Sequence, residues 1–252
     1  MELAGKRAVI VGGASGMGRA TAELFAGRGA SVAVLDRATS DGAKVAAQLG
    51  GEFEPVDVTD FDGAEHALGQ AVSRLGGLEV VVTTAGGGVP ARTLGRSGPH
   101  DLHTFREVLD LNAVASFNIS RLAAAHMAGN HPDDGERGVI VNTSSIAAFE
   151  GQIGQVAYSA AKAAVAGMCL TMARDLGGLG IRVCAIAPSL FDTGALAGMS
   201  EEQKSALVDG AAFPRRMGRP AEYAKLAAAI VDNPMLNAQC IRLDAGQRFG
   251  PK

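Results

Sequence analysis

The fold of this chain is decided by the stretch Lys6-Arg-Ala-Val-Ile-Val-Gly-Gly-Ala-Ser-Gly-Met-Gly18. Its first half is a short apolar run rich in valine and isoleucine, which is typical of a strand buried on both faces of a parallel sheet. Glycines end the run, and a helical pattern follows over residues 19–28. A second apolar run, Ser31–Asp36, ends in an acid. This order predicts a strand, a glycine turn, a helix and a parallel strand.

The glycine turn and the acid together favour a dinucleotide as the ligand. Glycines let the backbone approach a pyrophosphate, and a helix N-terminus offers it N–H groups and a positive dipole end. Asp36 lies 18 residues after Gly18, where its carboxylate can accept hydrogen bonds from ribose hydroxyls. The same carboxylate should repel a 2′-phosphate, so the sequence predicts NAD rather than NADP. Arg37 could pair with a 2′-phosphate instead, but the glycine turn holds no Arg or Lys to help it.

The rest of the chain continues the alternation of buried strands and helices. Strands are predicted at residues 52–56, 78–83, 138–143, 181–187 and 237–243, and helices at 41–49, 61–75, 102–128, 158–176 and 220–231. Residues 89–101 are predicted to form a loop. The 252 residues therefore predict one α/β domain, a doubly wound Rossmann-type fold with a seven-stranded parallel sheet and helices on both faces.

Composition and charge give no support to several other classes. The net charge is −3 and there is no basic run, so we expect no nucleic-acid or membrane partner. No apolar run approaches the roughly 18 residues of a bilayer span. The three cysteines and five histidines match no disulfide or metal-ligand spacing, so we expect no metal and a reducing compartment. The N-terminal residues resemble neither a signal peptide nor a transit segment, and we expect a cytoplasmic protein.

A second stretch, Tyr158-Ser-Ala-Ala-Lys162, carries candidate acid–base chemistry. Residues four apart lie on one face of a helix. A phenol titrates near pH ~10, and a neighbouring ammonium lowers its pKa, so the pair is a candidate general acid and base. Such pairs are common on helix surfaces. This one gains weight from the glycine turn and from Ser144 and Ser145, which follow a predicted strand.

Over essentially its whole length the chain resembles the short-chain dehydrogenase/reductase family. The matching motifs are Gly12-x-x-x-Gly16-x-Gly18, Asp57-Val58, Ala85-Gly86, Asn112, Ser145 and Tyr158-x-x-x-Lys162. The resemblance implies that Asn112, Ser145, Tyr158 and Lys162 form a catalytic tetrad. In that family the tyrosine exchanges a proton with the substrate, the lysine holds the nicotinamide ribose, the serine donates to the substrate oxygen and the asparagine holds a relay water. The chain departs from the family pattern at Val11 and Thr84, where Thr and Asn are usual.

The resemblance also implies which residues contact the cofactor and the substrate. The cofactor contacts would be Gly12, Ser15, Gly16, Met17, Gly18, Asp36, Asp57, Val58, Thr84, Ala85, Gly86, Tyr158, Lys162, Phe191 and Thr193. The substrate contacts would be Ser145, Gln155 and Tyr158. Apart from the resemblance, the length of the segment 190–213 makes it a candidate substrate lid, because loops of that length in a compact domain tend to be functional. Some alternatives stay open: Met17 and Val58 could be plain core, Asp57 a helix cap, and Gln155 a polar residue at a helix N-terminus.

A narrower resemblance is to the short-chain 3-hydroxyacyl-CoA dehydrogenases, the group that includes the mitochondrial multifunctional hydroxysteroid dehydrogenase. Residues 130–158, 187–193, 213–223 and 233–237 carry it. It implies NAD-dependent oxidation of short or branched 3-hydroxyacyl-CoA thioesters by a homotetramer, with Arg215, Arg216 and Arg219 as candidates for binding the CoA phosphates. The alternatives are a 3-oxoacyl-(carrier-protein) reductase, an alcohol or hydroxysteroid dehydrogenase, or a non-catalytic NAD-binding scaffold.

Overall fold

The computed structural model describes residues 1–194 and 199–251. Seven parallel strands form one sheet in the order β3-β2-β1-β4-β7-β8-β9. The strands are β1 (Arg7–Val11), β2 (Ser31–Asp36), β3 (Glu52–Pro55), β4 (Val80–Thr83), β7 (Gly138–Thr143), β8 (Ile181–Pro188) and β9 (Cys240–Leu243). The predicted seven-stranded parallel sheet is therefore confirmed, although β4 and β9 begin later than expected.

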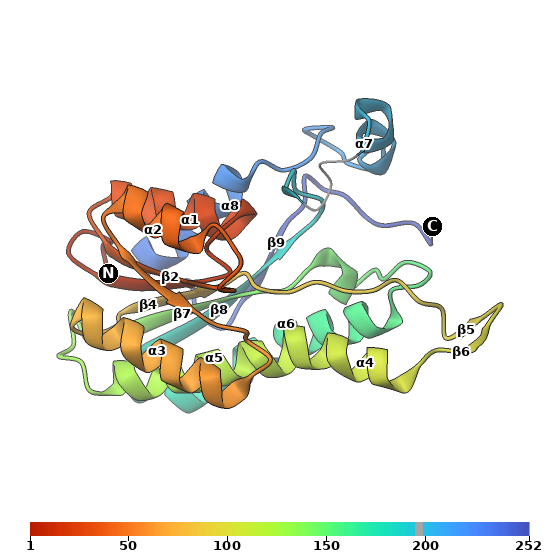
Figure 1. Cartoon of the computed structure of the whole chain (residues 1–252). Coiled ribbons are helices and arrows are strands. Elements are labelled where there is room, and N and C mark those ends of the chain that lie inside the picture. The colour runs from red at the N-terminus through yellow and green to blue at the C-terminus, as the bar shows by residue number, and fades with distance from the viewer. Residues whose placement is uncertain (195–198, 252) are drawn as a thin grey trace.

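Helices cover both faces of this sheet (Figure 1). One face carries α1 (Gly16–Gly27), α2 (Gly42–Leu49) and α8 (Pro220–Asp232), and the other carries α3 (Phe61–Leu75), α5 (Ala115–Ala128) and α6 (Val156–Gly177). Side chains alternate along each strand, so Ala8 and Ile10 of β1 pack under α1 and α8, whereas Val9 and Val11 pack against the opposite helices. Burial on both faces explains why the central strands β1 and β4 read as nearly unbroken apolar runs.

The strand order places a ligand crevice at the carboxyl ends of β1 and β4. From β1 the chain moves outward to β2 and β3, and from β4 it moves the other way to β7, β8 and β9. The connections diverge at this point, and open α/β sheets bind ligands where they diverge. The turn after β1 contains Gly12, and the loop after β4 contains Thr84. These two turns therefore face one crevice.

The long helix expected at residues 102–128 is interrupted. It consists of α4 (Leu102–Leu109), a five-residue π-helical turn at Asp110–Val114, and α5. Asn112 lies at the centre of the π-helical turn. Turns of this kind occur mostly as single insertions in α-helices and often at functional sites. The interruption therefore marks the position that the family resemblance assigns to the tetrad asparagine.

Two further segments differ from the sequence prediction. The expected loop at 89–101 contains a small hairpin of β5 (Leu94–Gly95) and β6 (Gly98–Pro99), whose strands are too short to show periodicity. Of the expected lid at 190–213, residues 195–198 lie outside the described part of the chain. The lid also contains α7 (Glu201–Leu207). This helix begins with a capping box, in which the Ser200 hydroxyl and the Gln203 side chain each accept the other residue's backbone N–H, at 3.2 Å and 2.8 Å.

Among the described residues, α6 alone is long and apolar enough to cross a membrane, by length and composition only, with a mean hydropathy of 1.3. This corrects the expectation that no stretch approaches that length. The helix contacts β8 and carries Lys162, which is buried in the domain, so the core helix of a sheet protein explains the composition. Only 39% of the apolar window is buried within the single chain.

Candidate active site

The turn after β1 is a cradle that only glycine can form. Gly12 has φ +81°, and a Cβ there would lie 2.6 Å from the backbone nitrogen of Ala85. A Cβ on Gly18 would lie 2.2 Å from the carbonyl oxygen of Gly12. The Thr84 hydroxyl donates to the Val11 carbonyl at 3.0 Å and so ties the two turns together. Thr84 thus retains a polar bracing contact at a position where the family usually has Asn.

The first turn of α1 is open to a ligand. Ser15 is the N-cap, yet its side chain caps none of the helix N–H groups, and the first turn contains no acidic residue. Uncapped N–H groups and the positive end of the helix dipole suit a phosphate. The cradle and the helix end together fit the pyrophosphate of a dinucleotide, because Gly12 and Gly18 let the turn pack closely against itself and the loop after β4, while the start of α1 offers its uncapped N–H groups.

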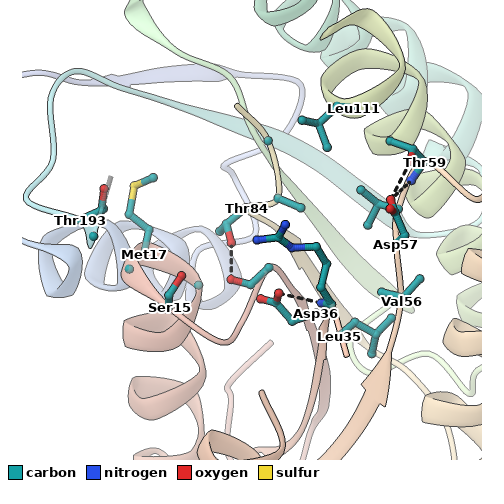
Figure 2. A pocket seen from close by; sticks show the side chains of 18 of the residues that line it. Ser15, Met17, Leu35, Asp36, Val56, Asp57, Thr59, Thr84, Leu111 and Thr193 are labelled. Atoms are coloured by element: carbon teal, nitrogen blue, oxygen red, sulfur yellow. Dashed lines mark hydrogen bonds between the residues drawn. The ribbon is translucent and has the colours of Figure 1, made fainter. Parts of the chain in front are cut away.

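A cleft of about 870 Å³ opens over this cradle (Figure 2). Its volume lies within the range of small-molecule and cofactor sites, about 300–1,000 Å³. The predicted cofactor residues that line it are Gly12, Ser15, Gly16, Met17, Gly18, Asp36, Asp57, Val58, Thr84, Ala85, Gly86 and Thr193. Sequence reasoning missed Leu35, Val56, Thr59, Glu107, Asp110, Leu111 and Gly194, and considered Arg37 only as a possible partner of a 2′-phosphate. Asp110 and Leu111 could have been predicted to line the cleft, because they directly precede Asn112 in the sequence.

Two carboxylates lie at one end of the cleft. Asp36 accepts hydrogen bonds from the backbone N–H groups of Ala14 at 3.0 Å and Arg37 at 2.8 Å, so its orientation is fixed by the glycine turn. Asp57 accepts from the hydroxyl and the backbone N–H of Thr59, at 2.6 Å and 2.9 Å. These bonds, and to a smaller degree the Arg37 charge, lower the pKa of Asp57. This end of the cleft therefore holds an ionised carboxylate at neutral pH.

The alternative role considered for Asp57, as a helix cap, belongs to Asp60. The Asp60 carboxylate accepts the N–H of Gly63 at 3.1 Å and is the N-cap of α3. Asp57 lies outside that helix and lines the cleft.

Asn112 is fully buried and its amide is engaged by the backbone. Its Oδ1 accepts the N–H of Gly87 at 3.1 Å, and its Nδ2 donates to the carbonyls of Gly87 at 2.7 Å and Val108 at 2.8 Å. Both amide hydrogens are used, so one Oδ1 lone pair is the remaining capacity of the side chain. The relay water that the resemblance assigns to Asn112 stays a prediction, and the bonds present hold the loop after β4 in place.

Lys162 lies behind Gly86 and, like Asn112, Ser145 and Tyr158, is not itself among the residues that line the cleft. Its side chain is buried, and its ammonium donates to the Thr143 carbonyl at 2.8 Å. Burial lowers the pKa of Lys162 to about 8. A Cβ on Gly86 would lie 3.1 Å from Lys162 Nζ and 2.6 Å from Asn112 Oδ1. Since Gly86 lines the cleft, a small residue here is what lets the lysine and the asparagine approach it.

Tyr158 and Ser145 lie beside this lysine. The Nζ of Lys162 is 5.7 Å from the centre of the Tyr158 ring. Burial raises the pKa of the Tyr158 phenol, and the neighbouring Ser145 hydroxyl opposes that rise. The spacing of Tyr158 and Lys162 predicted a lowered pKa for the phenol. This prediction was wrong, because helical spacing does not show that the ring is buried. Ser145 Oγ accepts the N–H of Ala147 at 3.1 Å, and its own hydrogen serves the Tyr158 oxygen, where a substrate oxygen could take the place of the phenol as acceptor.

Phe191 and Gln155 do not line the cleft. The Phe191 ring is buried in the core and packs over Gly218, where a Cβ would lie 2.6 Å from it. Its predicted contact with the nicotinamide therefore has no support from the position of the ring. Gln155 Oε1 accepts the N–H of Gln152 at 3.1 Å at the start of α6. This contact fits the alternative in which Gln155 is a polar residue at a helix N-terminus.

Among the three arginines suggested for CoA, Arg216 is already paired. It makes two hydrogen bonds to the Glu222 carboxylate, at 3.0 Å and 2.6 Å. Arg219 is the N-cap of α8, and its N–H donates to the same carboxylate at 2.7 Å. Arg215 is exposed. The geometry thus gives Arg216 a structural task at the end of the lid.

The cysteines and possible metal ligands add no further chemistry to the cleft. Cys169 and Cys240 pack into one small cluster. Burial raises the pKa of Cys169 to about 12 and also raises the pKa of Cys184 and of Cys240, which disfavours the reactive thiolate. Within residues 1–194 and 199–251, no group of three or more His, Cys, Asp and Glu side chains could hold a metal ion.

Comparison with known proteins agrees with this geometry. Residues 6–204 match the family model described as short chain dehydrogenase. The chain is 48% identical over 248 residues to 3-hydroxyacyl-CoA dehydrogenase type-2 of Drosophila melanogaster, covering 96% of this chain and 97% of that protein. It is 48% identical over 249 residues to the Homo sapiens protein of that name, covering 97% and 95%. The crystal structure of 3-hydroxyacyl-CoA dehydrogenase type-2 from Mycobacterium avium superposes with a TM-score of 0.94 at 41% identity, covering 98% of each chain.

Proposed function

The chain belongs to the short-chain dehydrogenase family and is an oxidoreductase that binds a nicotinamide cofactor, and from this premise we propose that it interconverts a 3-hydroxyacyl-CoA thioester and its 3-oxo form with NAD(H). The observation that carries the proposal is the convergence of Ser145, Tyr158 and Lys162 beside a glycine-cradled cleft. The substrate class is drawn from the names of the relatives, which match the chain over nearly its full length.

The bound cofactor supplies the hydride acceptor or donor, and the protein supplies position, charge and proton transfer. Tyr158 takes the proton of the substrate hydroxyl in oxidation and returns it in reduction. Ser145 donates its hydroxyl hydrogen to the substrate oxygen and stabilises the negative charge that develops there. Lys162, held by the Thr143 carbonyl, carries the ammonium that favours the phenolate form of Tyr158.

NAD rather than NADP is the preferred cofactor in this proposal. The fixed carboxylate of Asp36 lies in the cleft, where it suits ribose hydroxyls and repels a phosphate. Asp57 adds a second ionised carboxylate nearby. Arg37 is the one basic residue lining the cleft among the described residues, and its charge already acts on Asp57.

A homotetramer is the proposed assembly. The apolar side chains of Val114, Phe117 and Leu170 on the helix layer of α5 and α6 are 39%, 47% and 46% exposed. Packing a second copy on this layer would bury these side chains. Light scattering during size-exclusion chromatography should give four times the chain mass, and Phe117→Asp should lower it.

The test is a reduction assay followed at the NADH absorbance band. Purified protein is mixed with acetoacetyl-CoA and NADH, and separately with NADPH. We expect loss of absorbance with NADH and little with NADPH. Tyr158→Phe should slow the reaction at least ~100-fold, the usual contribution of a positioned acid, while NADH still binds.

Each result leads to one conclusion. Turnover of the thioester that is lost in Tyr158→Phe supports both the substrate class and the role of the phenol. No turnover with either cofactor, while NADH binds, removes the thioester as substrate and moves the assay to carrier-protein thioesters, secondary alcohols and steroids. Binding without turnover on all of them would make the protein a non-catalytic scaffold.

A further inference from the structure

Tyr223 is fully buried in α8, on the face of the sheet opposite to the helix that carries Lys162. Its ring packs in the core cluster beneath α1 and α8. Its hydroxyl lies 2.7 Å from the Oγ1 of Thr143, at the carboxyl end of β7. A buried hydroxyl costs free energy unless it is hydrogen-bonded. This contact is therefore what allows a tyrosine here instead of a phenylalanine.

The direction of this hydrogen bond follows from proton counting. Thr143 Oγ1 also lies 2.6 Å from the carbonyl oxygen of Thr83, which can only accept. A hydroxyl has one hydrogen, so the hydrogen of Thr143 goes to Thr83. Tyr223 must then be the donor to Thr143. The result is a directed chain from Tyr223 through Thr143 to Thr83, joining α8, β7 and β4.

The main-chain carbonyl of Thr143 contacts Lys162. Its carbonyl oxygen accepts from Lys162 Nζ at 2.8 Å. The next residue, Ser144, donates its hydroxyl to the Lys162 backbone carbonyl at 2.8 Å. The end of β7 and the residue after it thus contact both the ammonium and the backbone of Lys162. From the opposite face of the sheet, the Tyr223 hydroxyl donates a hydrogen bond to the side chain of Thr143.

We propose that Tyr223 is a positioning residue that acts through Thr143 to aim the ammonium of Lys162 at the cleft. The proposal rests on the proposed function in taking Lys162 as part of the reacting site. Without the bond from Tyr223, Thr143 can turn its side chain, and the last peptide of β7 loses a constraint. The ammonium then samples more than one position relative to the Tyr158 phenol and to the cofactor.

Three groups in the described part of the chain lie close to the side chain of Lys162. They are Tyr158 from its own helix, Asn112 from the π-helical turn and Thr143 from β7. Burial lowers its pKa, and within residues 1–194 and 199–251 no carboxylate or guanidinium contributes to that shift. Tyr158 is the one other titratable group among these three. A change in the position of the Lys162 ammonium should therefore appear as a change in the pKa of the Tyr158 phenol.

The experiment compares Tyr223→Phe, Thr143→Val and Thr143→Ser with the unmodified chain, in both directions of the reaction and as a function of pH. Tyr223→Phe keeps the ring and removes one hydroxyl. Thr143→Ser keeps the hydrogen bonds and should restore activity. Ser120→Ala is the control. Ser120 is fully buried, and its hydroxyl donates to the Ser116 carbonyl at 2.7 Å in α5 and accepts from Asn142 Nδ2 at 3.0 Å, so the change removes one buried hydroxyl and one hydrogen bond to β7 without touching Thr143.

We expect kcat to fall about five- to tenfold in Tyr223→Phe and Thr143→Val, the loss that corresponds to one hydrogen bond. The acid limb of the oxidation profile should move to higher pH, because a less well-placed ammonium favours the phenolate of Tyr158 less. The dissociation constant of NADH should rise several-fold. Thr143→Ser and Ser120→Ala should resemble the unmodified chain in all three measurements.

The proposal is overturned if Tyr223→Phe matches Ser120→Ala in kcat, in the pH of the acid limb and in NADH affinity. A drop in melting temperature with those three unchanged would make the hydroxyl purely structural. If the unmodified chain turns over no substrate, the proposed function fails. The link between Tyr223 and Lys162 is then tested by NADH affinity alone. In that case equal affinity in Tyr223→Phe and the control would overturn the link to Lys162.

Discussion

Asn112 and Gly87 exchange two hydrogen bonds, one from the Gly87 N–H to Oδ1 at 3.1 Å and one from Nδ2 to the Gly87 carbonyl at 2.7 Å. The amide side chain thereby pairs with the loop as a neighbouring strand would. A third bond, from Nδ2 to the Val108 carbonyl, ties the same amide to its own helix. One side chain thus connects the interrupted helix to the wall of the cleft.

Asn112→Ala should destabilise the protein and weaken cofactor binding. The change removes three hydrogen bonds and leaves buried backbone groups without partners, at a cost of about 2–4 kcal/mol. For a chain of this size that corresponds to a melting temperature lower by about 5–10 °C. Differential scanning calorimetry and NADH titration measure the two effects. Asn118→Ala is the control, since Asn118 is a buried asparagine of α5 that contacts Phe61 and Arg121 instead. Equal effects of the two variants would contradict a special role for Asn112.

Gly86→Ala should abolish activity while Gly87→Ala is tolerated. A Cβ on Gly86 meets Asn112 Oδ1 at 2.6 Å and Lys162 Nζ at 3.1 Å, whereas a Cβ on Gly87 meets nothing closer than 4.0 Å. Neither glycine needs a positive φ, so the contrast reports contact alone. We expect a loss of at least ~100-fold in kcat/KM for Gly86→Ala, because misplacement by about 1 Å can cost that much. Steady-state assays on the pair suffice, and similar rates for the two variants would contradict the packing at Gly86.

Lys162→Met should stabilise the cofactor-free protein at neutral pH. The difference between the ordinary value of 10.5 and the folded pKa of about 8 corresponds to a burial cost of about 3 kcal/mol for the charged form. The hydrogen bond to Thr143 offsets about 1 kcal/mol of it. Urea unfolding at pH 7 should therefore show the variant to be more stable by about 1–3 kcal/mol, with no activity.

This advantage should disappear as the pH rises. Between about pH 8 and 10.5 the unfolded chain binds a proton on Lys162 that the folded chain has lost. The stability of the unmodified protein relative to Lys162→Met therefore rises with pH across that window. Unfolding at pH 7 and pH 9.5 tests the slope. Lys225→Met, at an exposed position of α8, should give a constant difference. A constant difference for Lys162→Met as well would mean that the ammonium is not buried.

Replacing Asp36 should change the cofactor preference. Asp36→Ser removes the carboxylate that we propose binds the ribose, and Arg37 remains in the cleft to receive a 2′-phosphate. We expect the ratio of kcat/KM for NADH over NADPH to fall by at least about 10-fold, the equivalent of one charged contact. Arg37→Ala in the unmodified background should move the ratio the other way. An unchanged ratio in both variants would show that neither side chain reads the phosphate.

The sheet could be predicted from the sequence because both of its faces are covered. A strand such as β1, covered on each side, must be apolar wherever it is buried, and residues 8–11 show that run directly. The glycine cradle was equally visible, since the collision of a Cβ on Gly18 with Gly12 is a property of one turn. The place of Asp36 followed from the length of a single strand, helix and strand unit.

What the sequence could not predict depends on partners distant in the chain. The π-helical turn is accompanied by bonds from Asn112 to Gly87, which lies 25 residues earlier. Tyr223 and Thr143 are 80 residues apart, and no spacing rule connects them. The direction of the pKa shift of Tyr158 was predicted wrongly for the same reason, because the burial that raises it comes from tertiary packing.

The five-residue turn at the middle of the α4–α5 helix also sets its rotational phase. A helix advances about 100° per residue, so one extra residue turns everything before Asp110 by that angle relative to everything after Val114. The segment before the turn contacts α6, and the segment after it contacts α3. A single-residue deletion here would preserve the helix and still swing the α4 end away from the catalytic helix. A change of one residue in chain length would therefore disturb the site from within a helix, without altering any loop.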